Sequence, residues 1–104
     1  MNHEWKEKTV VDINKIKEGV SLAAMEYPIR KASLFGSYAE GQAHSGSDVD
    51  LQVEFVTKSV SLLTLNALKY RLEEILGIDV DVIHGPLSED SMLVLRKVVP
   101  VYES

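Results

Sequence analysis

The sequence predicts an α+β domain in which a small mixed sheet of about four strands is flanked by helices. Two observations support this prediction. Two stretches, within residues 12–27 and 58–77, carry apolar residues at helical spacing. Three short segments, 29–35, 49–55 and 78–83, are continuously apolar or alternate apolar and polar residues, as strands do. The length of 104 residues and the absence of internal repeats indicate one domain spanning 1–104.

The first predicted helix begins near Asp12, which suits an N-cap position, and ends at Tyr27-Pro28, because the residue before proline avoids the helical region. Gly19 is expected to weaken it. Residues 1–9, which are mostly polar, are expected to be flexible or peripheral. The apolar face of this helix is expected to comprise Ile13, Ile16, Val20, Ala23 and Ala24.

The first predicted strand starts at Ile29 or Arg30, and its apolar end, 32–35, is stopped by Gly36. This pattern indicates a buried strand that ends in a tight turn. Gly36 lets the backbone approach a ligand closely, and Ser37 offers a hydroxyl and an N–H group at the start of a short helical candidate, Tyr38–Glu40. Such a turn suits a phosphate group.

Asp48 and Asp50 lie two residues apart at the start of the next predicted strand. Residues i and i+2 of a strand face the same side, so the two carboxylates are expected to converge. Neighbouring carboxylates repel each other, and such oxygen ligands suit Mg²⁺ or Mn²⁺, with a nucleotide triphosphate completing the coordination. The alternative is that Asp48-Val49-Asp50 forms only the polar face of an edge strand.

The second predicted helix lies within 58–77, with Ser59 or Ser61 as its N-cap and Gly77 as its C-cap. Its polar residues, Lys69, Arg71, Glu73 and Glu74, are expected to form an ordinary solvated face.

Acidic side chains alternate with apolar ones in the next predicted strand, Ile78–Ile83, so that Asp79 and Asp81 share one face. A third helix is expected from Glu89 to about Val98, opened by an acidic first turn. The final segment, 99–104, is expected to be an edge strand or an extended tail.

Gly36-Ser37, a ten-residue spacer and Asp48-x-Asp50, with apolar residues on both sides, resemble the signature of the DNA polymerase beta-type nucleotidyltransferase superfamily. The chain length and the run GSYAEGQAHSGSDVDL are similar to the minimal nucleotidyltransferases, the MNT domains found beside HEPN-domain partners. The resemblance spans essentially the whole chain and implies a nucleotidyltransferase-like core. The superfamily carries a third acid in a strand of the Val-Asp-x-Val kind, which favours Asp81 over Asp79.

The resemblance implies transfer of a nucleoside monophosphate, most simply AMP from ATP, to a hydroxyl group with release of pyrophosphate. Asp48 and Asp50 would hold two Mg²⁺ or Mn²⁺ ions, Asp81 would bind one of them and take the acceptor's proton, and Gly36 and Ser37 would cradle the triphosphate. HEPN-associated relatives act as antitoxins that add AMP to a tyrosine of the HEPN toxin. A HEPN-domain partner is therefore expected, and the alternative is a non-catalytic antitoxin that only covers its partner.

One residue departs from the family pattern. Relatives often carry arginine where this chain has Glu40, so a positive contact to the nucleotide is missing at that position. Either Arg30 or Lys31 substitutes for it, or the nucleotide is held more weakly.

The composition limits the remaining functions. A formal net charge of −5 disfavours direct binding to nucleic acid, and the absence of cysteine excludes disulfides and thiolate chemistry. The apolar runs are too short to span a membrane, and the polar N-terminus lacks the apolar core of a signal peptide, so a cytoplasmic protein is expected. An exposed edge at the last strand could support a homo-oligomer.

Overall fold

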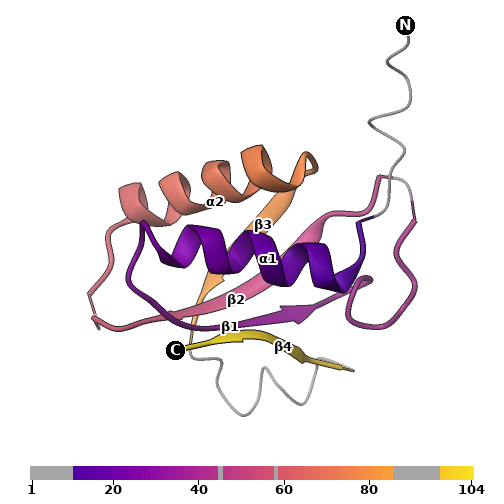
Figure 1. Cartoon of the computed structure of the whole chain (residues 1–104), viewed down its shortest axis with the longest axis horizontal. Coiled ribbons are helices and arrows are strands. Elements are labelled where there is room, and N and C mark those ends of the chain that lie inside the picture. The colour runs from indigo at the N-terminus through magenta and orange to yellow at the C-terminus, as the bar shows by residue number, and fades with distance from the viewer. Residues whose placement is uncertain (1–10, 45, 58, 86–96) are drawn as a thin grey trace, which may run out of the picture.

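The computed structural model describes residues 11–44, 46–57, 59–85 and 97–104 (Figure 1). Two helices and four strands are present in these ranges, which confirms the predicted α+β class. The elements are α1 (Ile13–Ala24), β1 (Ile29–Phe35), β2 (Val49–Phe55), α2 (Leu62–Leu76), β3 (Val80–His84) and β4 (Val99–Glu103).

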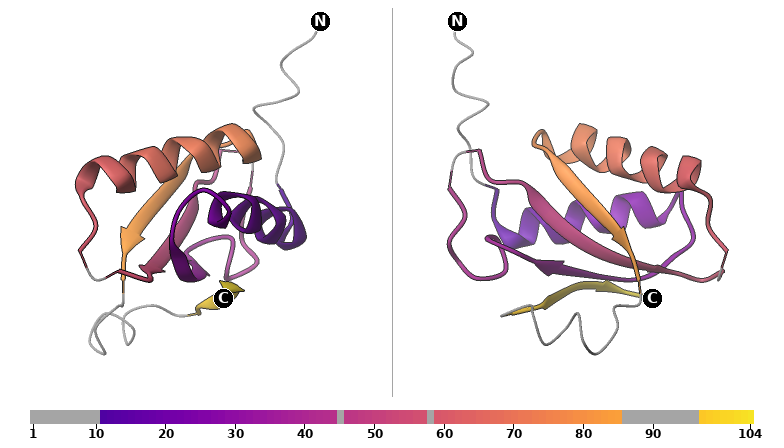
Figure 2. Two further views of the ribbon diagram at one scale, coloured as in Figure 1. Left: turned by 60° about the vertical axis from the view of Figure 1, so that its left-hand side comes forward. Right: turned by 180° about the vertical axis from the view of Figure 1, so that it is seen from behind.

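The four strands form one mixed sheet in the order β3-β2-β1-β4. β1 runs antiparallel to both β2 and β4, whereas β3 runs parallel to β2. The parallel pair arises because α2 carries the chain back along the sheet between β2 and β3. Both helices cover the same face of the sheet (Figures 1 and 2). The opposite face is therefore the one that polar side chains of the strands can occupy.

Alternation along β2 separates these two faces. Val49, Leu51 and Val53 are fully buried and belong to the core between sheet and helices, whereas Asp50 and Glu54 point to the opposite face and are partly exposed. The other fully buried large side chains of this core are Ile16, Val20, Leu34, Leu68, Leu72 and Val80.

Three of the four helix ends lie where the sequence predicts. Helix α1 ends earlier, at Ala24 instead of Tyr27-Pro28, because the N–H groups of Met25 and Glu26 bond only three residues back, to Leu22 O and Ala23 O. Asp12 is the N-cap of α1, and its Oδ1 accepts the Lys15 N–H at 2.8 Å. Of the two candidate serines, Ser61 is the N-cap of α2, since its Oγ accepts the Thr64 N–H at 3.2 Å. Gly77 ends α2 in the left-handed conformation, with φ 75°.

Gly19 has a packing role that the sequence does not reveal. It is buried in α1, and a Cβ atom there would lie 2.9 Å from Leu76 Cδ2 and 3.3 Å from Ile75 Cγ2. The glycine therefore allows α1 and α2 to approach each other closely, which compensates for its poor helix propensity.

Two predicted elements differ in the structure. The short helical candidate Tyr38–Glu40 is a turn, because the bond from Glu40 N–H to Gly36 O at 3.1 Å, which has α-helical spacing, is followed by a bond of three-residue spacing from Gly41 N–H to Tyr38 O at 3.4 Å. β3 begins at Val80 instead of Ile78, because its pairing with β2 starts at Val80.

The predicted third helix falls almost entirely outside the described residues. Its last residues, Lys97 and Val98, are described and are not helical. The predictions for residues 1–9 also lie outside the described ranges. Within those ranges, no helix is both long and apolar enough to cross a membrane.

Candidate active site

The parallel pairing of β2 and β3 brings two of the predicted aspartates together. In this register Asp50 lies directly opposite Asp81, flanked by the pair Val49 and Val80. Paired residues face the same side of a sheet, so both carboxyl groups lie on the face away from the helices. Asp81 thus lies on the strand next to the one that carries Asp50.

The Asp50 carboxyl group is destabilised in its charged form. Burial raises the pKa of Asp50, and so do the negative charges of Asp81 and Asp48 and a hydrogen bond with the Asp81 side chain. The Asp50 and Asp81 side chains are therefore close to each other, and a cation between them would relieve the repulsion between their charges.

The turn after β1 packs directly against this pair. Gly36 has φ 77°, and a Cβ atom at this position would overlap the Asp50 carboxyl group. Glycine is therefore required here both for its backbone conformation and for the space that it leaves. The predicted phosphate-binding turn and the predicted metal-binding aspartates consequently belong to one site.

Backbone hydrogen bonds and buried side chains hold this turn. The Gln42 N–H donates to Ser37 O at 2.9 Å, while Tyr38 and Ala39 are buried in the core, with only 5% and 3% of their surfaces exposed. Ser37 itself is partly exposed next to Gly36. The turn is thus anchored from the inside, and Ser37 remains accessible to a ligand.

Asp48 does not complete a preformed metal site. It is exposed just before β2 and acts on Asp50 through its charge. In the described part of the chain, no three His, Cys, Asp or Glu side chains are grouped so that they could hold a metal ion. The structure therefore brings Asp50 and Asp81 together, with Asp48 at the margin of the pair.

Asp79 contributes to the pairing of β2 with β3 through its backbone. Its carbonyl oxygen accepts the Val49 N–H at 3.0 Å, which starts the pairing of β2 with β3, and its side chain is exposed. Ser47 closes a turn just before β2, since its Oγ accepts the His44 N–H at 3.0 Å and its own N–H donates to His44 O at 2.9 Å.

A buried amide lies next to Asp50 on the same face of β2. Gln52 is only 4% exposed, and Gly85 packs directly against its side chain. Within the described residues, the Nε2 of Gln52 has no hydrogen-bond partner. An unpaired buried donor is costly, and such groups concentrate where a ligand or water completes the hydrogen bonding.

Sequence reasoning missed the role of Glu73 in α2. This residue was expected on a solvated face, yet its Oε2 accepts the Val80 N–H at 3.0 Å, directly before Asp81. Lys69 Nζ donates to the same oxygen at 2.8 Å. The Lys69–Glu73 spacing of four residues is visible in the sequence, but the contact with β3 is not.

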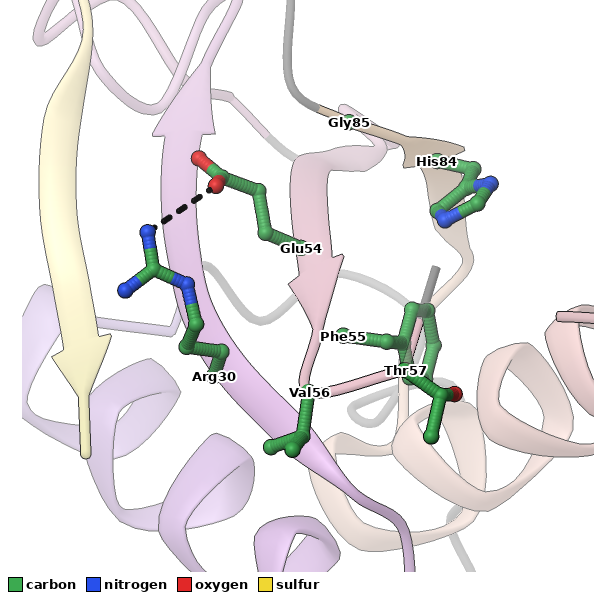
Figure 3. A pocket seen from close by; sticks show the side chains of 7 residues that line it. All are labelled: Arg30, Glu54, Phe55, Val56, Thr57, His84 and Gly85. Carbon is green, nitrogen blue, oxygen red and sulfur yellow. Dashed lines mark hydrogen bonds and ion pairs between the residues drawn. The ribbon is translucent and has the colours of Figure 1, made fainter. Parts of the chain in front are cut away.

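The cavity drawn in Figure 3 lies away from these aspartates, at the far ends of β2 and β3. Its volume is about 360 Å³. Glu54 is four residues beyond Asp50, which corresponds to roughly 13 Å along a strand. The residues that line the cavity are Arg30, Glu54, Phe55, Val56, Thr57, His84 and Gly85.

Arg30 and Lys31 are poorly placed to replace the missing arginine of the family pattern. Both lie near the start of β1, whereas Gly36 follows its end. The Arg30 guanidinium forms an ion pair with Glu54 at 3.5 Å, as the dashed line in Figure 3 shows. The structure thus does not support Arg30 or Lys31 as the substitute contact.

Comparison with known proteins agrees with this geometry. The family described as "Polymerase beta, Nucleotidyltransferase" matches residues 9–100. A Methanocaldococcus jannaschii protein, provisionally named as a protein adenylyltransferase, is 43% identical over 88 residues, which cover 80% of this chain and 92% of the relative. The protein adenylyltransferase MntA of Thermococcus cleftensis is 38% identical over 77 residues, which cover 72% and 77% of the two chains.

Solved structures share the fold. A toxin–antitoxin crystal structure with AMP-PNP aligns with a TM-score of 0.70 and 18% identity, covering 85% of this chain and 73% of the other. A structure of a tri-AMPylated Shewanella oneidensis HEPN toxin in complex with its MNT antitoxin aligns with a TM-score of 0.64 and 14% identity, covering 88% and 73%. At these identities the likeness concerns the fold alone.

Proposed function

Since the chain belongs to the polymerase beta nucleotidyltransferase family, we propose that it transfers AMP from ATP to a hydroxyl group of a HEPN-domain partner and thereby acts as an antitoxin. One observation carries the proposal: Asp50 and Asp81 face each other on parallel strands beside the Gly36 turn. Carboxylates gathered next to a glycine turn suit a reaction that moves a highly charged phosphate group.

The residues of this site fit divalent cations. A cation bound by Asp50 and Asp81 would offset the negative charges of Asp81 and Asp48 that raise the pKa of Asp50. Asp48, whose charge already acts on Asp50, is the third ligand that we propose. Two bound Mg²⁺ ions, or Mn²⁺, would neutralise the triphosphate and lower the pKa of the acceptor hydroxyl.

Residues of the chain would also bind the triphosphate and accept the proton of the acceptor. Gly36 and Ser37 would hold the triphosphate through the turn that follows β1. The acceptor oxygen would attack the α-phosphorus of ATP. The bond between this phosphorus and the oxygen that bridges it to the β-phosphorus would break, and pyrophosphate would leave. Asp81, which is exposed beside Asp50, would take the proton of the attacking hydroxyl.

The relatives support the identity of the acceptor. Two are named protein adenylyltransferases, and in one similar structure the AMPylated molecule is the HEPN toxin. We propose a tyrosine of a HEPN-domain protein as the acceptor, because its phenolic hydroxyl can serve as the nucleophile. A cytoplasmic location, where ATP is available, is part of this proposal.

The decisive experiment follows the label from α-³²P-ATP, with Mg²⁺, onto the protein that co-purifies with this chain. We expect Asp81→Asn to lower the rate of transfer by about 10³-fold or more, as loss of a catalytic carboxylate does. Asp79→Asn is the matched control, because Asp79 is an exposed carboxylate two residues away, and its rate should stay within about threefold of wild type.

The double variant Asp48→Ala/Asp50→Ala should also abolish labelling. Equal loss in Asp79→Asn and Asp81→Asn would contradict the assignment of Asp81. If a stable complex forms and no label moves with any nucleotide or divalent ion, the protein is a binding-only antitoxin.

A further inference from the structure

Among the strands that the structure describes, β3 lies at the edge of the sheet, and β2 is its one neighbour. Backbone groups on the side away from β2 need another acceptor or exposure to water. Val80 is fully buried, so water cannot serve its N–H group. Instead, this N–H donates to Glu73 Oε2 of α2 at 3.0 Å.

The chain directly before Asp81 is therefore held from both sides. On the inner side, Asp79 O accepts the Val49 N–H of β2 at 3.0 Å. On the outer side, the N–H group of the next residue, Val80, donates to the Glu73 carboxylate. These two bonds fix the position at which β3 begins, and Asp81 is its second residue.

Glu73 is kept as an ionised acceptor. Burial acts to raise the pKa of Glu73, but the hydrogen bonds from Lys69 and Val80 and the positive charge of Lys69 outweigh it, so the pKa is lowered. Lys69 Nζ lies 2.8 Å from Glu73 Oε2 at the favourable four-residue spacing. A charged acceptor binds an N–H more strongly than a neutral one.

We propose that Glu73 is a positioning residue for the active site, which fixes Asp81 opposite Asp50 by binding the Val80 N–H, with Lys69 holding Glu73 in place. The inference rests on the proposed function, because it assumes that Asp81 binds a cation and accepts the proton. Groups that orient metal ligands without contacting the metal typically contribute 10- to 100-fold to metal affinity or activity.

The experiment compares Glu73→Ala and Glu73→Gln with the control Glu74→Ala. Glu74 is the next residue of the same helix and is mostly exposed, and its partner is Arg71 at 2.7 Å instead of β3. Loss of Glu74 thus removes a helix carboxylate and an ion pair without touching Val80. Glu73→Gln keeps an acceptor oxygen of the same reach but removes the charge.

Three experiments are carried out on each purified variant. Amide hydrogen exchange by NMR reports the protection of the Val80 N–H, and titration with Mn²⁺ followed by electron paramagnetic resonance reports cation affinity. AMP transfer gives kcat and the KM for ATP. For Glu73→Ala we expect Val80 exchange to be more than about tenfold faster, and Mn²⁺ affinity and kcat to fall about 10-fold or more, with the KM for ATP within about threefold.

Glu73→Gln should lie between wild type and Glu73→Ala, and Glu74→Ala should match wild type in all three experiments. Mn²⁺ affinity and kcat in Glu73→Ala that equal those of Glu74→Ala would overturn the inference, even if Val80 exchanged faster. If wild type transfers no AMP but binds Mn²⁺, the proposed function fails while the Mn²⁺ titration still decides the role of Glu73. If wild type binds no Mn²⁺, both fail.

Discussion

Among single residues, Asp50 is the one at which the needs of the site and of the fold conflict. Burial and the charges of Asp81 and Asp48 raise its pKa above the value in the unfolded chain. A carboxyl group with a raised pKa makes the fold less stable at any pH above that pKa, where it is ionised in both states. We therefore predict that Asp50→Asn, without divalent ions and at neutral pH, increases the free energy of unfolding by about 0.5–1 kcal/mol.

Urea denaturation measures this change. The difference in free energy of unfolding between Asp50→Asn and wild type should shrink as the pH falls through the raised pKa, because the Asp50 carboxyl group of folded wild type then becomes neutral. Addition of Mg²⁺ should stabilise wild type and leave Asp50→Asn nearly unchanged. Asp79→Asn, which alters an exposed carboxylate, is the control. A lower free energy of unfolding in Asp50→Asn than in wild type at neutral pH would show that the charged Asp50 carboxyl group does not destabilise the fold.

The helices and strands were largely predictable from local patterns. Asp12 marked the start of α1, and alternation marked β2, because these signals lie within or next to the elements themselves. Pro28 did not mark the end of α1, which stops earlier, at Ala24. The start of β3 was not predictable, since Ile78-Asp79 continues the same alternation and only the pairing of Val80 with Val49 decides where the strand begins. The role of Gly19 was equally hidden, because it depends on α2.

The N-cap of α2 can be tested directly, because two serines compete for the role in the sequence. Ser61→Ala removes the oxygen that accepts the Thr64 N–H and should lower the free energy of unfolding by about 1 kcal/mol. Ser59→Ala should change it by less than about 0.5 kcal/mol, because Ser59 is exposed outside the helix. Equal losses in chemical denaturation would show that the cap is not specific to Ser61.

Across the whole molecule, the site combines predictable and unpredictable parts. The spacing of Gly36, Asp48 and Asp50 is a local property of the sequence, and Asp81 was favoured over Asp79 through the family resemblance. The parallel register that places Asp81 opposite Asp50 depends on the fold and was not predicted. Glu73 was not foreseeable, since its contact with Val80 depends on how α2 lies along the edge of the sheet.

The edge strand β4 shows that the stability of the fold and the geometry of the site can be separated. Val101 is buried and belongs to the same core as α1. Among the described strands β4 pairs with β1, and both β1 and β2 separate it from β3, which carries Asp81. Val101→Ala should therefore lower the free energy of unfolding by about 1–3 kcal/mol, as loss of buried methyl groups does. Glu103→Ala, an exposed change on the same strand, should have little effect.

Mn²⁺ affinity, measured well below the melting temperature, should stay within about twofold of wild type in Val101→Ala, because distant sites without shared partners act independently. The pair Val101→Ala and Glu73→Ala then separates the two contributions: the first should lower stability with an intact site, and the second should weaken the site. If Val101→Ala weakened Mn²⁺ binding as strongly as Glu73→Ala, the position of Asp81 would depend on the whole sheet instead of on the contact between α2 and β3.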